Sequence, residues 1–409
     1  MRFLNAYIFR NRKEGFSYGG FEVENGLFSR LFFYPENEKK TASDFVFDGT
    51  AGENPLTDEN RKDPKAVKAL DVVDLGGAYV IPGLIDVHTH GNSRADFSDA
   101  DYDGLLRMGK YLLSRGITSF APASMTLPPA RLKEIYAVAK RLYEEDPEDS
   151  ARLLGINMEG PFFSEKRKGA QNAAYLLAPD FQIFQELYEE SGGLIRIACV
   201  APELPNALDF IRRASDLCTV SVAHTDADYE QARLAFEAGA RQVTHLFNAM
   251  PGLHHRNPGV IGAAAERTDV RAELICDGIH VHESAVRVAF QLFPGRLCLI
   301  SDAARCLGMP DGTYELGGQE TFLSGRRLTL KDGTIAASAT DLYDCMLNAV
   351  SFGIPKEEAI HAATLVPAEA VGREPETGSI EEGKRADFVV CNAALQRQRV
   401  YREGRLCES

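Results

Sequence analysis

Short apolar runs alternate with longer amphipathic stretches through the middle of the chain. The apolar runs have the length of strands, as in residues 80–90 (VIPGLIDVHTH) and 297–303 (LCLISDA). The stretches between them space their apolar residues three or four apart, as in residues 102–115 (YDGLLRMGKYLLSR), which is typical of one face of a helix. Alternating strands and helices predict a parallel sheet. About eight such units favour an α/β fold of the (β/α)8 TIM-barrel type.

The two ends of the chain have a different pattern. The first eighty residues contain β-rich runs broken by Gly, Asn and Asp, and residues 385–406 again read as strand, turn and strand. We therefore expect residues 1–80 and 366–409 to form one small β-sandwich domain, with the barrel occupying residues 81–365. Residues 35–68 are polar and predict an exposed insertion.

The composition of the 409 residues, with 44% hydrophobic and 25% charged side chains, is that of a soluble globular protein. A net charge of −14 without a basic stripe argues against a nucleic-acid partner. The sequence shows neither an apolar stretch long enough to span a bilayer nor a signal peptide, so we expect no membrane partner. The eight scattered cysteines include no C-x-x-C pair, which favours reduced thiols in the cytoplasm.

Side chains able to do chemistry occur where the predicted barrel strands end, which is where this fold builds its active sites. His88 and His90 are two residues apart on a strand, so both imidazoles point to the same face. Imidazole and carboxylate ligands suit Zn²⁺ or Fe²⁺ in a catalytic site. The residues that end strands 1, 3, 5, 6 and 8 therefore predict a metal centre: His88, His90, Glu159, His224, His245 and Asp302.

This ligand set favours the hydrolysis of an amide. A bound metal polarises a carbonyl oxygen and lowers the pKa of a bound water. Asp302 could take a proton from that water and pass it to the leaving amine. In the competing interpretation, Asp302 caps the following helix, and His224 and His245 are ordinary core histidines. Their positions at the ends of predicted strands favour the metal centre.

Five motifs resemble one known family: PGLIDVHTHG, NMEGPF, HTDAD, THLFNAM and LISDA. Together they resemble the N-acetylglucosamine-6-phosphate deacetylases of the amidohydrolase superfamily, over nearly the whole chain. The resemblance implies that N-acetylglucosamine 6-phosphate is hydrolysed to glucosamine 6-phosphate and acetate. It also implies one or two divalent ions per subunit, a phosphorylated N-acetylhexosamine as substrate, and a homodimer.

The resemblance further implies a role for each site residue. The principal metal would be held by Glu159, His224 and His245, while His88 and His90 would support a second metal with Glu159 as the bridge. Asp302 would be the catalytic acid and base.

The substrate contacts are also implied by the resemblance. The backbone amides of Asn248 and Ala249 would meet the phosphate, together with Arg256, which in dimeric members reaches in from the partner subunit. His280 would polarise the acetyl carbonyl or contact the sugar.

Two departures from the family pattern leave the sugar epimer open. Gln171 stands where many members have a histidine that contacts the sugar, and Ala336 and Ala337 replace small residues that line the substrate pocket. The first alternative is therefore N-acetylgalactosamine 6-phosphate. A cyclic-amide hydrolase would need a lysine at the end of strand 4, which residues 199–203 (CVAPE) lack. An inactive scaffold would have lost Asp302 or the ligand histidines, and the chain retains them.

Overall fold

The computed structural model describes residues 1–41 and 71–407. The predicted insertion at residues 35–68 therefore lies, from residue 42 onward, outside the described residues.

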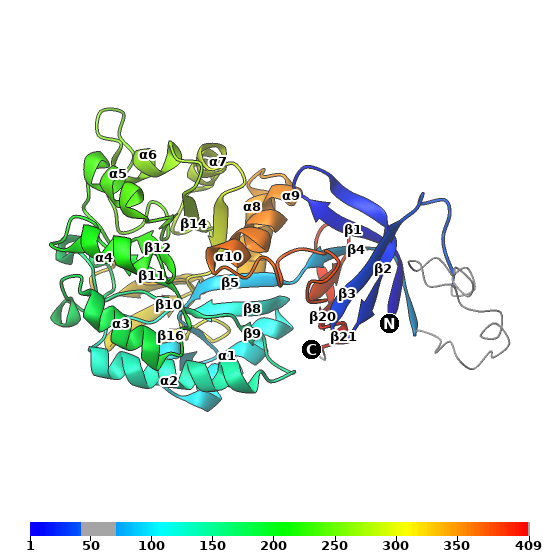
Figure 1. The fold of residues 1–409 in the computed structure, drawn as a ribbon, viewed down its shortest axis with the longest axis horizontal. Coiled ribbons are helices and arrows are strands. Elements are labelled where there is room, and N and C mark those ends of the chain that lie inside the picture. Colours follow the sequence, from blue (N-terminus) through cyan, green and yellow to red (C-terminus); the bar gives the residue numbers. More distant parts are fainter. Residues whose placement is uncertain (42–70, 408–409) are drawn as a thin grey trace.

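Eight parallel strand positions of the described chain curl into a barrel, which confirms the predicted fold class (Figure 1). The third position is divided into two short strands, β9 and β10. A parallel bridge between Ala123 and Asn157 joins the two parts of the sheet. The other junction is closed by the amide of Asp302, which donates to the carbonyl of His88 at 2.8 Å. The strands are β5 (Leu84–Thr89), β8 (Ile117–Pro122), β9 (Arg152–Leu153), β10 (Ile156–Met158), β11 (Ile195–Val200), β12 (Thr219–Val222), β13 (Gln242–Val243), β14 (Arg271–Ile275) and β15 (Leu297–Ile300).

Helices cover the outside of this barrel (Figure 1). The predicted helix at residues 102–115 is α1, and it buries Leu105, Met108 and Leu112 on the face that its sequence spacing predicts. The helices are α1 (Tyr102–Ser114), α2 (Pro129–Glu145), α3 (Phe181–Glu190), α4 (Ala207–Ala214), α5 (Tyr229–Ala238), α6 (Gly259–Ala265), α7 (Glu283–Leu292), α8 (Leu342–Ser351), α9 (Lys356–Ala363) and α10 (Leu365–Ala370).

Strands from both ends of the described chain form one sheet beside the barrel, in the order β21-β20-β19-β4-β1-β2-β3. The sheet curls over an aromatic core in which the ring of Phe3 lies 4.9 Å from that of Phe21 and 5.1 Å from that of Phe388. The expected β-domain built from both termini is therefore confirmed. Its strands are β1 (Arg2–Asn11), β2 (Gly15–Glu24), β3 (Leu27–Phe33), β4 (Val72–Pro82), β19 (Phe388–Cys391), β20 (Arg397–Arg402) and β21 (Arg405–Leu406).

The last helix, α10, lies against the barrel. Its Val366 and Ala368 are buried in the same apolar cluster as Ile85 of β5 and Ile300 of β15. The chain past residue 366, which we expected to begin the terminal domain, therefore first completes the packing of the barrel strands.

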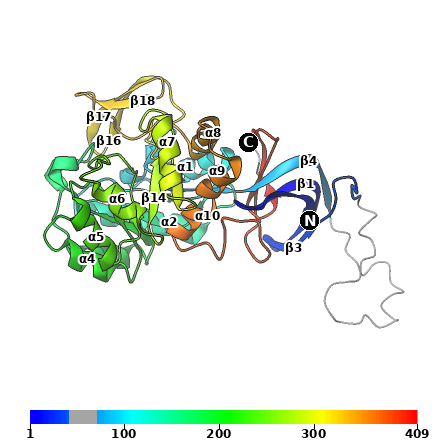
Figure 2. The same cartoon turned by 90° about the horizontal axis from the view of Figure 1, so that it is seen from above.

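A second, three-stranded antiparallel sheet was not predicted. It consists of β16 (Gly312–Leu316), β17 (Gln319–Ser324) and β18 (Arg327–Leu330), and it is inserted between β15 and α8. Figure 2 shows it at the side of the barrel away from the terminal sheet. Leu316, Leu323 and Leu328 bury their side chains against Met125, in the segment that follows β8. The insertion therefore covers part of the edge where the barrel strands end. A short hairpin, β6 (Gly91–Asn92) and β7 (Ala95–Asp96), follows β5.

No helix in the described part of the chain is long and apolar enough to cross a membrane. The eight cysteines are all free thiols, and six of them are buried.

Candidate metal centre

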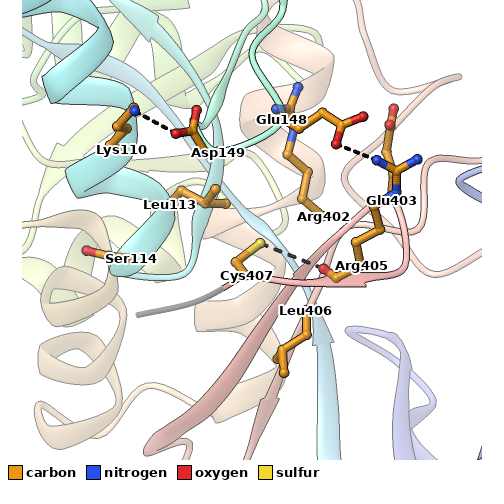
Figure 3. Close-up of a pocket in the computed structure, with 10 residues that line it drawn as sticks. All are labelled: Lys110, Leu113, Ser114, Glu148, Asp149, Arg402, Glu403, Arg405, Leu406 and Cys407. Carbon is orange, nitrogen blue, oxygen red and sulfur yellow. Dashed lines mark hydrogen bonds and ion pairs between the residues drawn. The ribbon is translucent and has the colours of Figure 1, made fainter.

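The direction of the strands decides which end of the barrel carries chemistry. β4 ends at Pro82 and β5 begins at Leu84, so the barrel strands start beside the terminal sheet and end on the far side (Figure 1). A pocket of about 480 Å³ lies on the near side, between α1 and residues 402–407 (Figure 3). Its lining includes an ion pair of Lys110 with Asp149 at 2.5 Å. The candidate site lies instead at the carboxyl ends of the strands.

Three predicted ligands meet at the ends of strands β10, β12 and β13. The Nε2 atoms of His224 and His245 each lie 3.2 Å from Oε1 of Glu159, and they lie 3.2 Å from each other. All three side chains are buried. Two imidazole nitrogens and a carboxylate oxygen that converge in this way form a set of donors suited to one divalent cation.

The other three predicted ligands form a second cluster at the ends of β5 and β15. Nε2 of His90 lies 3.1 Å from Oδ1 of Asp302, and Nε2 of His88 lies 3.7 Å from the same oxygen. Glu159 joins the two clusters, because its Oε1 lies 3.4 Å from His88 Nε2 and its Oε2 lies 3.4 Å from His90 Nε2. The six residues predicted from the sequence therefore form one continuous buried centre.

The orientation of each imidazole is fixed by a contact at its other nitrogen. Nδ1 of His90 lies 3.0 Å from the carbonyl oxygen of Ala123. Nδ1 of His224 lies 3.0 Å from the carbonyl oxygen of Arg167, and Nδ1 of His245 lies 3.2 Å from that of Asn248. A carbonyl accepts a proton from Nδ1, so each ring keeps the Nε2 lone pair for a metal.

The fourth histidine has a different partner. Nδ1 of His88 lies 2.9 Å from Oε2 of Glu273, a fully buried residue of β14. The sequence reasoning missed Glu273. A usable signal was present, since this carboxylate lies between apolar residues of a predicted barrel strand (RAELI), and a buried charge needs a partner.

The charges of the centre shift one another's pKa values. Burial alone would raise the pKa of Glu159, but His88, His224 and His245 hold it well below its usual range. Burial likewise acts against the charged form of His88, yet Glu159, Glu273 and Asp302 raise its pKa well above the ordinary histidine value. The surroundings therefore keep the carboxylates ionised, as metal ligands must be.

The backbone is strained at three of the ligands. His224, His245 and Asp302 have φ values of 45°, 28° and 49°, in the left-handed region that non-glycine residues seldom adopt. Each lies just past the end of its strand, where the chain must turn the side chain into the barrel mouth. Such conformations persist where the surrounding structure imposes them, and they concentrate at functional sites.

Gln171 lies against the centre, with both ends of its amide engaged. Its Nε2 donates to Oε2 of Glu159 at 2.9 Å, and its Oε1 accepts from the amide of Thr126 at 2.7 Å. The side chain is buried. In this structure Gln171 therefore orients Glu159, and its expected contact with a sugar stays a prediction.

His280 is held by a neighbouring carboxylate. Its Nδ1 lies 2.8 Å from Oδ2 of Asp277. Oδ1 of Asp277 accepts from the amides of Ile279 and His280 at 2.8 and 2.9 Å. The loop after β14 therefore fixes the ring while leaving Nε2 for another partner.

The residues expected to bind the phosphate lie in two places, Asn248 and Ala249 near the metal centre and Arg256 in a loop. Asn248 and Ala249 follow His245 closely, but the amide of Asn248 donates to the carbonyl of His245 at 2.9 Å. That amide is therefore already engaged in this structure. Arg256 lies in an exposed loop before α6.

Ala336 and Ala337 precede Ser338, which pairs with the end of β15. The amide of Ser338 donates to the carbonyl of Asp302 at 2.7 Å, so the segment runs beside that residue.

The remaining histidines lie outside the metal centre. His282 caps α7, His254 and His255 are exposed, and His361 lies 3.4 Å from the carbonyl of Gly295.

One orphaned atom tests whether a metal fits these residues. Nε2 of His88 is buried and has no hydrogen-bond partner among the described residues, although it faces oxygens of Glu159 and Asp302. A buried polar atom without a partner is costly, and a divalent cation would satisfy it. The donor set and this nitrogen both fit a metal.

The fold and the site together define a barrel hydrolase with a buried histidine and carboxylate centre. The sequence profile of the Amidohydrolase family matches residues 79–406, so the chain belongs to that family.

Within that family, curated relatives agree with the resemblance found in the motifs. An N-acetylglucosamine-6-phosphate deacetylase from Vibrio furnissii is 36% identical over 339 residues, covering 82% of this chain and 84% of the relative. An N-acetylgalactosamine-6-phosphate deacetylase from Escherichia coli O157:H7 is 34% identical over 343 residues, with coverage of 82% and 90%. A Mycobacterium smegmatis N-acetyl-D-glucosamine-6-phosphate deacetylase, solved in complex with N-acetyl-D-glucosamine-6-phosphate, matches with a TM-score of 0.85, 28% identity, and coverage of 100% and 99%.

Proposed function

We propose that the protein hydrolyses the acetamide of N-acetylglucosamine 6-phosphate to glucosamine 6-phosphate and acetate. The observation that carries this proposal is the buried centre, in which Asp302 lies beside His88 and His90, and Glu159 lies beside all four histidines. The relatives from Vibrio furnissii and Mycobacterium smegmatis, both named as deacetylases of this sugar phosphate, support the same substrate. The activity is that of a carbon–nitrogen amide hydrolase.

The cofactor is a divalent metal, which we propose to be Zn²⁺ or Fe²⁺ with one or two ions per subunit. When bound, it supplies Lewis acidity toward the acetyl carbonyl and a water of lowered pKa. Glu159, His224 and His245 would hold the principal ion, and His88, His90 and Asp302 the second. Both clusters contain the imidazole and carboxylate donors that these ions accept.

Asp302 is the proposed proton carrier. It is buried, and His88 and His90 hold its pKa below the usual range against the effect of burial. The carboxylate is therefore ionised and can accept a proton from water. The same oxygen then returns the proton to the leaving amine, so that the sugar departs as a neutral amine rather than as an anion.

The other residues would bind and orient the substrate. His280, whose Nδ1 lies 2.8 Å from Oδ2 of Asp277, would polarise the acetyl carbonyl or contact the sugar. Arg256 and the amides of Asn248 and Ala249 would hold the phosphate, with the planar guanidinium matching two phosphate oxygens. Binding at the amide of Asn248 would require it to leave its present partner, the carbonyl of His245.

N-acetylgalactosamine 6-phosphate is the second candidate substrate, supported by the Escherichia coli O157:H7 relative. Gln171, Ala336 and Ala337, the positions at which this chain departs from the family pattern, are the proposed contacts that select the epimer. A cyclic amide is less well supported, since residues 199–203 at the end of β11 include no lysine.

The test is an assay of acetate release from both 6-phosphorylated N-acetylhexosamines, using enzyme of measured metal content. We expect the gluco compound to give the higher kcat/KM. A higher value for the galacto compound would reverse the assignment of the epimer, and no acetate from either compound would refute the deacetylase proposal.

We further propose a cytoplasmic homodimer. The eight free cysteines support a reducing compartment, and the exposed position of Arg256 lets it reach a neighbouring subunit. Sedimentation velocity tests the dimer, and a single species with the mass of one chain would contradict it.

A further inference from the structure

Glu273 is a buried carboxylate behind the metal centre. Its side chain lies on β14 and is fully excluded from solvent. Oε1 accepts from Nε2 of Gln242 at 2.6 Å, while Oε2 lies 2.9 Å from Nδ1 of His88 and accepts from the amide of His245 at 3.3 Å. An ionised carboxylate can only accept hydrogen bonds, so one proton of His88 belongs on Nδ1, and a cation that displaces any second proton takes the lone pair of Nε2.

That lone pair faces the space between the two clusters. Nε2 of His88 lies 3.4 Å from Oε1 of Glu159 and 3.7 Å from Oδ1 of Asp302, and it has no hydrogen-bond partner among the described residues. A nitrogen acceptor and two carboxylate oxygens cannot satisfy one another without a proton or a cation between them. A divalent cation satisfies all three.

The partner of Nδ1 distinguishes His88 from the other histidines of the centre. The other three histidines of the centre place Nδ1 on neutral backbone carbonyls, whereas His88 places it on a charged side chain. A carboxylate behind a ligand imidazole makes the imidazole a stronger ligand. Its negative charge also offsets the repulsion between two cations held close together in a buried site.

We propose that Glu273 is a positioning residue that commits the protein to a second divalent cation at His88, His90 and Asp302. It acts through His88 and does not touch the cation or the substrate. The inference rests on the proposed function, since it concerns the metal centre of that same site. It goes further by naming the residue that determines whether the second ion is retained.

The experiment titrates metal-free protein with Mn²⁺ and follows free ion and spin-coupled ion pairs by electron paramagnetic resonance. Glu273→Gln keeps the size of the side chain and removes its charge. We expect the affinity for the second Mn²⁺ to fall by about 10- to 100-fold, with loss of the spin-coupled signal. The affinity for the first ion should fall less, since Glu273 contacts its ligand His245 only at the backbone amide. Asp387→Asn removes another buried carboxylate, in the segment just before β19, and should bind both ions as the wild type does.

Three outcomes would overturn the proposal: unchanged second-ion affinity in Glu273→Gln, equal loss of both ions, or a wild type that binds only one ion at saturation. The acetate assay tests the proposed reaction independently of this titration. A wild type that binds two ions yet releases no acetate refutes the proposed reaction and leaves the role of Glu273 intact.

If Glu273→Gln does not fold, Gln242→Met removes the 2.6 Å contact that holds the carboxylate. It should weaken the second ion in the same direction, and an unchanged second-ion affinity in that variant would overturn the proposal.

Discussion

Replacing Asp302 by asparagine tests the proton transfer most directly. The carboxylate lies 3.1 Å from Nε2 of His90, and the backbone has a φ of 49°. Asparagine has nearly the same shape and tolerates this left-handed conformation better than most residues. The variant should therefore fold, and it should keep the principal ion, which is held by Glu159, His224 and His245.

The size of the effect follows from the role. Positioned general acid and base catalysis contributes about 10²- to 10⁴-fold. Losing it corresponds to about 3–5 kcal/mol of transition-state stabilisation. We expect kcat to fall by this factor while KM changes little, because Asp302 is not among the proposed phosphate or sugar contacts. Asparagine is also a weaker cation ligand, so second-ion occupancy should fall too.

The assay measures acetate release at matched occupancy of the principal ion, with metal content measured by mass spectrometry. Asp341→Asn is the matched control. Asp341 is also buried, but it caps α8 and pairs with Arg115 at 2.5 Å, and asparagine caps a helix equally well. Its turnover should stay within about twofold of wild type. A near-normal rate in Asp302→Asn would refute the assignment of Asp302 as the proton carrier.

Further predictions concern the ions, the phosphate and the effect of pH. His88→Ala should lose the second ion before the first; simultaneous loss of both ions, measured by mass spectrometry, would contradict the division into two clusters. Arg256→Ala should raise KM for the phosphorylated sugar far more than for its unphosphorylated analogue, and equal kinetic effects would argue against a phosphate contact. Burial raises the pKa of Asp86 to about 7, so the folded state binds a proton more tightly than the unfolded state, and this contribution to stability is lost between about pH 4 and 7. Urea titrations should therefore show that the free energy of unfolding of Asp86→Asn rises relative to that of the wild type between these pH values, by up to about 4 kcal/mol. A difference in unfolding free energy that does not change with pH would contradict this.

Much of the centre could be predicted because strand ends are visible in the sequence. His88 and His90 follow an apolar run, and the i, i+2 spacing places both on one face. Glu159 likewise follows an apolar strand directly, since β10 ends at Met158. Parallel strands in a closed barrel all end at one rim, so residues far apart in the chain meet there without any pairwise signal between them.

The supporting residues were harder to predict. Glu273 lies in the middle of a strand rather than at its end, and nothing local shows that its neighbour is His88, 185 positions away in the chain. Gln171 lies in a loop, where a glutamine is ordinarily a surface residue, and its contact with Glu159 depends on how that loop folds back. Such partners depend on tertiary packing, which periodicity does not specify.

The sheet of β16, β17 and β18 was missed for a different reason. Residues 312–330 carry β-rich runs separated by Gly-Gly and Ser-Gly turns, which is a recognisable hairpin pattern. The barrel fold predicts a helix after each strand, and this sheet is an insertion that the fold does not require. The expected start of the terminal domain at residue 366 falls within α10, whose apolar residues pack against the barrel.

The left-handed backbone at His224, His245 and Asp302 has a consequence for engineering and evolution. Each such residue costs of the order of 1–3 kcal/mol, and the cost does not depend on whether a metal is bound. Selection for thermal robustness alone would therefore favour glycine or asparagine at these positions, in opposition to selection for turnover. A design procedure that optimises stability alone would therefore replace His224, His245 and Asp302 first, and it would remove ligands of the proposed metal centre.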